Sequence, residues 1–200
     1  MLKYTKLSYS RRAITSIIIL ALLFALFPYN NTQAHTYGGH KWSLWRADYW
    51  LDIAWWPNWL IHNSFSTWNN ACNSGCAGFE FRFAGYNARG QRWDDYNTVT
   101  ISNRGATAWV ARTYNRWWNS GYMRESDVVF NTYHPWGAYG ESNMYDVRNV
   151  ATHEFGHWLV LLDQHNPWDY WDTMYYSTYK GETRKRTLAW DDKRGIRAIY

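Results

Sequence analysis

The chain has 200 residues, a formal net charge of +5 and only two cysteines. This length suits one domain with a real hydrophobic core. Its basic residues form no nucleic-acid-binding motif, so we expect no nucleic acid partner. The aromatic content is unusual, with 16 Trp and 17 Tyr. We assign these rings first to the core, where large aromatics bury much area, and second to a surface that binds sugars or wall polymers.

The first 34 residues have the pattern of a secretory signal peptide. A positive n-region is formed by Lys3, Lys6, Arg11 and Arg12. An apolar segment follows at 13–27, and Thr32-Gln33-Ala34 offers the small residues that a signal peptidase needs. An uncleaved anchor is the alternative, although the apolar segment is short for a bilayer span of roughly 20 residues. Cleavage would leave 35–200 as a single secreted, extracellular domain, whose basic charge could hold it on an anionic cell wall.

Alternation and helical spacing predict the elements of this domain in chain order. The first strand is expected at Tyr49–Trp55, and a helix runs from Pro57 to about Asn70. Further strands are predicted at 79–84, 98–102 and 127–131, with an edge strand at 108–111. This order of elements describes an α/β sandwich in which one helix backs the sheet and a later helix carries the motif described below.

The two cysteines are Cys72 and Cys76. In an exported chain such a closely spaced pair favours a small disulfide loop. A zinc-binding pair is less favoured, because no second pair completes a site.

Residues 151–163 read A-T-H-E-F-G-H-W-L-V-L-L-D and contain an H-E-x-x-H motif. Residues four apart share one face of a helix, so His153 and His157 can point their imidazoles at one zinc ion. Glu154 lies beside that ion, where its carboxylate can take a proton from a water molecule. An apolar stripe falls on a separate face: Val147, Ala151, Phe155, Trp158 and Leu162. The alternative is a chance match with surface or core histidines.

The third ligand is expected at Asp163, six residues after His157. The resulting spacing, H-E-x-x-H-x-x-x-x-x-D, resembles the metzincin zinc-protease signature H-E-x-x-H-x-x-G-x-x-H in its variant ending in Asp. The family has Gly where this chain has Val160. Valine at positive φ is costly, so we expect the turn to be built differently. His165 is therefore an alternative third ligand.

Downstream, Thr173-Met174-Tyr175-Tyr176 stands where metzincins have a methionine-containing turn beneath the zinc ligands. The resemblance makes Met174 the Met-turn residue, with ordinary core packing as the alternative. Tyr176 matches the place where astacin- and serralysin-like metzincins have a tyrosine near the metal, which implies a transition-state contact. The ending D-D-x-x-G-I-x-x-I-Y, from Asp191 to Tyr200, resembles the last catalytic-domain helix of matrixins. The basic triplet 184–186 is interpreted as a solvated loop.

The resemblance covers Asp127–Tyr200 well and Lys41–Phe83 in outline, and it identifies a matrixin-like metzincin of bacterial secreted type. It implies an α+β fold with a mixed twisted sheet backed by helices, in which the zinc-site helix precedes the Met-turn and a C-terminal helix. It also implies a Zn²⁺-dependent endopeptidase acting on protein or peptide substrates. We expect this enzyme to be a monomer. Structural Ca²⁺ is a further cofactor in many matrixins.

Two alternatives remain open at this point. One is a non-catalytic cell-wall or carbohydrate-binding module with a structural or degenerate metal site, favoured by the aromatic and basic residues and disfavoured by Glu154. The other is a metal-dependent amidase acting on wall peptides, with the same site and a different substrate.

Overall fold

The computed structural model describes residues 36–200 except 54–55, 74–77 and 107–108. The predicted signal peptide lies outside the described residues and stays a prediction. Within the described part, no helix is both long and apolar enough to cross a membrane.

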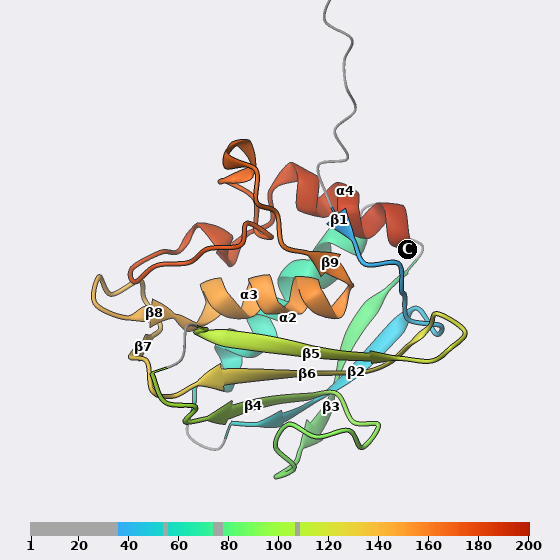
Figure 1. Ribbon diagram of the computed structural model, residues 1–200, viewed down its shortest axis with the longest axis horizontal. Helices are drawn as coiled ribbons and strands as arrows, with labels where there is room; N and C mark the ends of the chain where they lie inside the picture. The colour runs from blue at the N-terminus through green and yellow to red at the C-terminus, as the bar shows by residue number, and fades with distance from the viewer. Residues whose placement is uncertain (1–35, 54–55, 74–77, 107–108) are drawn as a thin grey trace, which may run out of the picture. The chain divides into compact units, whose positions relative to one another are not determined.

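A five-stranded mixed sheet forms the framework of the domain (Figure 1). Its strands are β2 (Arg46–Asp52), β3 (Glu80–Tyr86), β4 (Thr98–Ser102), β5 (Ala111–Trp117) and β6 (Met123–Asn131). In the order β3-β2-β4-β6-β5 every neighbouring pair is parallel except the last, where β5 runs antiparallel to β6 at the edge of the sheet. None of the described strands pairs with the outer edge of β5, so this edge is open to pairing with an extended chain.

Three helices lie on the same side of this sheet in Figure 1: α2 (Asn58–Asn73), α3 (Val147–Trp158) and α4 (Trp190–Ile199). Aromatic rings join the layers. Phe65 of α2 stacks on Phe155 of α3, with ring centroids 3.6 Å apart, and on Tyr49 of β2 at 3.9 Å. The Trp68 indole of α2 donates to the Thr152 carbonyl of α3 at 2.8 Å. Helix α2 thus fixes α3, which carries the motif, to the sheet.

The remaining elements are short. They are β1 (Thr36–Tyr37), β7 (Trp136–Gly137), β8 (Tyr145–Asp146), β9 (Leu161–Leu162) and the 3₁₀ turns η1 (Pro167–Asp169) and η2 (Arg184–Arg186). Strand β1 pairs antiparallel with β9. This pairing places the start of the domain against the segment that follows the motif helix.

Two buried carboxylates on β6 hold the loop that precedes β4. The Glu125 carboxylate accepts from the amides of Asp94 and Asp95 at 2.9 and 3.0 Å. The Asp127 carboxylate accepts from the amides of Thr98 and Arg92 at 2.8 and 3.1 Å. Burial raises the pKa of Asp127 to about 7 despite these hydrogen bonds.

The predicted fold class is confirmed, and most predicted elements are present. Strand β4 has the predicted bounds, and α2 extends three residues past the expected end at Asn70. The predicted bounds of β2 and β6 were wrong, because both strands begin before their apolar segments. The bounds of the edge strand expected at 108–111 were also wrong. Ala108 lies outside the described residues, and the edge strand, β5, occupies 111–117. Strand β5 reads A-R-T-Y-N-R-W, and its polar residues, typical of an edge strand, hide the apolar alternation.

The predicted disulfide cannot be placed, since Cys76 and the side chain of Cys72 lie outside the described residues. The aromatic side chains divide between core and surface. Trp68 and Trp158 are completely buried, whereas Trp168, Trp171 and Trp190 are 89%, 73% and 68% exposed. The prediction that the aromatic side chains belong to the core is therefore confirmed for some of them and wrong for others.

Candidate metal centre

Helix α3 begins at a well-formed N-cap. The Asp146 carboxylate accepts from the Asn149 amide at 2.8 Å and from the Arg186 guanidinium at 2.9 Å. Such a cap satisfies amides that the first turn leaves unpaired. The apolar face is buried as predicted at Val147, Ala151, Phe155 and Trp158. Leu162 does not belong to this face, because α3 ends at Trp158 and Leu162 lies 43% exposed on β9.

The two motif histidines are oriented by backbone carbonyls on the far sides of their rings. His153 Nδ1 lies 2.8 Å from the Thr173 carbonyl oxygen, and His157 Nδ1 lies 2.7 Å from the Leu161 carbonyl oxygen. Only a protonated Nδ1 can donate to a carbonyl, so these contacts assign the proton to Nδ1 and leave a lone pair on each Nε2. Such outer hydrogen bonds are the usual support of metal-binding histidines.

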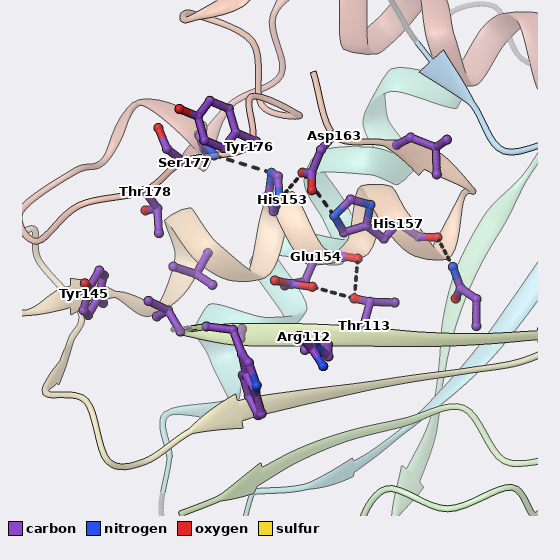
Figure 2. Close-up of a pocket in the computed structure, with 17 residues that line it drawn as sticks. Arg112, Thr113, Tyr145, His153, Glu154, His157, Asp163, Tyr176, Ser177 and Thr178 are labelled. Carbon is purple, nitrogen blue, oxygen red and sulfur yellow. Dashed lines mark hydrogen bonds and ion pairs between the residues drawn. The ribbon is translucent and has the colours of Figure 1, made fainter. Parts of the chain in front are cut away.

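Asp163 completes a group of three metal-ligating side chains, whose ligand atoms all lie within 4.8 Å of one another. Its Oδ1 lies 3.2 Å from His153 Nε2 and 3.5 Å from His157 Nε2 (Figure 2). This oxygen is buried and accepts no hydrogen bond. Two nitrogen lone pairs and an orphaned carboxylate oxygen repel one another unless a cation lies between them. The residues present therefore fit a zinc ion.

The electrostatics of the group centre on the Asp163 carboxylate. Burial, assisted by the neighbouring Lys185 ammonium, lowers the pKa of His153. Burial opposes charge on His157 as well, but the Asp163 carboxylate beside it raises the pKa of His157. Burial would raise the pKa of Asp163, yet the two imidazoles, when protonated, hold it well below its usual range. Asp163 is thus kept as a carboxylate, the form that binds a metal.

Val160 adopts the left-handed conformation, with φ of 63°. The expectation that valine would force a different turn was wrong. Left-handed backbone costs an L-residue about 1–2 kcal/mol. The Val160 side chain is only 4% exposed, and burying it contributes about 1.5–3 kcal/mol. Burial thus offsets the strain, and the turn returns Asp163 to the histidines.

The alternative third ligand, His165, lies outside this group. Its ring is exposed and packs against the Tyr176 ring, with centroids 4.7 Å apart. The intervening Gln164 is buried, and its backbone N–H donates to the Met174 carbonyl oxygen at 2.8 Å. Asp163 and His165 flank this fixed residue in the sequence, and of the two only Asp163 lies with the histidines.

Met174 is buried directly against the motif helix. A side chain at Gly156 would overlap Met174 Sδ, so the helix needs glycine at this position. Asp192, in the first turn of α4, accepts from the amides of Thr173 and Met174 at 2.8 and 3.2 Å. The C-terminal helix therefore fixes the turn whose Thr173 carbonyl orients His153. Asp191 and Asp192 are the acidic residues of this first turn.

The three candidate ligands and Glu154 line a cleft of about 670 Å³. One wall is β5, and the side away from Arg112 and Thr113 is formed by Tyr176, Ser177 and Thr178 (Figure 2). The Glu154 carboxylate is 6% exposed and accepts from the Thr113 hydroxyl at 2.6 Å. A carboxylate is thus held beside the metal group and open to a cleft that can hold a peptide.

Lys185 was not anticipated from the sequence. The basic triplet 184–186 is not a solvated loop, because Lys185 is only 1% exposed. Its ammonium donates to the Tyr175 carbonyl and lies 3.5 Å from His153 Nδ1. Burial lowers the pKa of Lys185 to about 8. A run of basic residues carries no local signal that its middle member is buried under the Met-turn.

This fold and site define a metzincin-type zinc metallopeptidase. The sequence profile of the matrixin family matches residues 60–200, more than half of the chain, and the chain belongs to that family. No curated protein matches the chain significantly.

In the described part of the chain, no other group of three or more histidine, cysteine or acidic side chains could hold an ion. Structural Ca²⁺ stays a prediction.

Proposed function

We propose that the chain is a secreted zinc endopeptidase in which Glu154 is the general base. The observation that carries this proposal is a buried carboxylate beside three convergent metal-ligating atoms, open to a cleft along an edge strand. The signal-peptide pattern of residues 1–34 supports export.

His153, His157 and Asp163 would hold the zinc ion. When bound, zinc polarises the carbonyl of the scissile peptide bond and lowers the pKa of a coordinated water to about 7. Glu154 takes the proton from the attacking water and then delivers it to the leaving amine nitrogen. Tyr176 lines the same cleft and is half-exposed, which supports a contact between its hydroxyl and the developing oxyanion.

The substrate would be an extended peptide that runs along β5. Within the described residues β5 pairs only with β6, so its outer backbone groups can bind a peptide in the manner of an added strand. This arrangement supports a protein or peptide substrate.

The decisive experiment compares the wild-type protein with Glu154→Ala for zinc content and for casein hydrolysis. We expect about one zinc ion in both proteins and hydrolysis only by the wild type, with the variant reduced at least about 100-fold. Hydrolysis that survives in Glu154→Ala would exclude this residue as the base. Zinc in both proteins without hydrolysis by either would refute the endopeptidase assignment for this substrate.

Exposed Trp168, Trp171 and Trp190 favour a second candidate, binding to a wall polysaccharide. Flat exposed rings stack on sugars, and the positive charge suits an anionic wall. Pull-down of Glu154→Ala with isolated cell-wall material tests this function separately from catalysis. Retention that is lost in Trp168→Ala would support it, and no retention would exclude it.

A further inference from the structure

The Glu154 carboxylate is held by one side chain of the neighbouring strand. Thr113 Oγ1, on β5, lies 2.6 Å from Glu154 Oε2 and 3.2 Å from the Glu154 carbonyl oxygen (Figure 2). A hydroxyl has one proton, and the shorter contact identifies the carboxylate oxygen as its main acceptor. This bond occupies Oε2 and leaves Oε1 free to receive a proton from water.

The hydroxyl is itself fixed in space by the sheet. Thr113 pairs with Val128 in the antiparallel register of β5 and β6. Two residues further along β5, Asn115 donates to the His157 carbonyl at 2.8 Å and accepts from the Ser126 hydroxyl at 2.6 Å. Strand β5 is therefore tied to the motif helix at two successive positions on one face.

A glutamate side chain has three rotatable bonds and points in many directions when it is not held. General-base catalysis requires the carboxylate within hydrogen-bond reach of the proton that it abstracts. We propose that Thr113 is a positioning residue that fixes the Glu154 carboxylate in its reactive orientation. This inference rests on the proposed function, because it assigns a partner to the proposed base.

The test compares Thr113→Val, which keeps the shape and removes the donor, with Thr113→Ser, which keeps the hydroxyl. General-base catalysis contributes about 10²–10⁴-fold, so partial loss of its geometry should lower kcat by roughly 10-fold or more in Thr113→Val. We expect KM within about twofold of wild type, because the change acts on the transition state. Thr113→Ser should restore most of the rate. Zinc content and melting temperature establish that each variant is folded and loaded.

A double-mutant comparison separates positioning from a structural role. If Thr113 acts only through the Glu154 carboxylate, Thr113→Val should not lower the residual rate of Glu154→Ala any further. A kcat unchanged in Thr113→Val, or an equal loss in the Glu154→Ala background, would overturn the proposal.

Failure of the proposal for Thr113 can be distinguished from failure of the proposed peptidase function. An inactive wild-type protein would refute the peptidase function, and a crystal structure of Thr113→Val would then decide the inference. A Glu154 side chain with a changed or disordered carboxylate supports positioning by Thr113. A carboxylate in the wild-type rotamer overturns it.

Discussion

Gly38 and Val160 are packed so closely that each limits what the other position can be. A Cβ added to Gly38 would lie 2.7 Å from Val160 Cγ1 and 3.3 Å from Leu162 Cδ2. The Gly38 amide also donates to the Val160 carbonyl at 2.8 Å, so moving the two segments apart would break this hydrogen bond. We therefore predict that Gly38→Ala lowers the free energy of unfolding by about 1–3 kcal/mol, the usual cost of overpacking.

Val160→Ala should relieve that overlap. Alone, this substitution removes two buried carbon atoms and should cost about 1.6 kcal/mol, at about 0.8 kcal/mol for each. In the double variant the new methyl of residue 38 occupies the space that Val160 Cγ1 leaves. The combined loss should therefore be smaller than the sum of the single losses by at least about 1 kcal/mol. Urea unfolding of the four zinc-loaded proteins measures this coupling. Additive losses, within about 0.5 kcal/mol, would refute the packing argument.

Three further predictions follow from the site and the sheet. Gly156→Ala adds a methyl group that overlaps Met174 Sδ, so the free energy of unfolding should fall by at least about 2 kcal/mol. Thermal or urea unfolding measures this loss, and unchanged stability would contradict the described packing. In a zinc competition assay, Asp163→Ala should weaken zinc binding by at least about 100-fold, whereas the control His165→Ala should leave it unchanged. Equal losses in the two variants would refute Asp163 as the third ligand. The pKa of Asp127 is about 7 in the folded protein, and its reference value for the unfolded chain is 3.8. Between these pH values the folded state binds one more proton than the unfolded state, so the free energy of unfolding falls as pH rises. By that linkage the wild type should lose about 2–3 kcal/mol relative to Asp127→Asn between pH 5 and pH 8, and parallel pH profiles of urea unfolding would contradict it.

Local periodicity was sufficient to predict the motif helix. His153 and His157 lie four residues apart on one face of the helix. Apolar residues at helical spacing (Val147, Ala151, Phe155 and Trp158) mark a separate, buried face. The helix, the ligand pair and the core contact were therefore all predictable from one repeat. The position of Glu154 beside the ligands follows from the same geometry. Likewise, α2 was predictable because Ile61, Phe65 and Trp68 recur at helical spacing.

Features that depend on long-range partners were not predictable. The cost of Val160 at positive φ is a local quantity, but the burial that offsets it depends on Gly38, 122 positions earlier in the chain. The burial of Lys185 depends on the Tyr175 carbonyl and the fold of the Met-turn. Thr113 stands in a strand without clear alternation, so nothing local distinguishes it from other edge residues.

The pairing of Thr36–Tyr37 with Leu161–Leu162 ends one residue before Asp163. A strand of two residues has few hydrogen bonds and opens at a low free energy. Its partner leads directly into a candidate ligand, so opening of β1 loosens Asp163, and a bound ion holds β1 closed. The first strand is therefore a reporter of metal occupancy. Deuterium exchange at the Gly38 amide, which donates to Val160, should slow when zinc is added, with no substrate present.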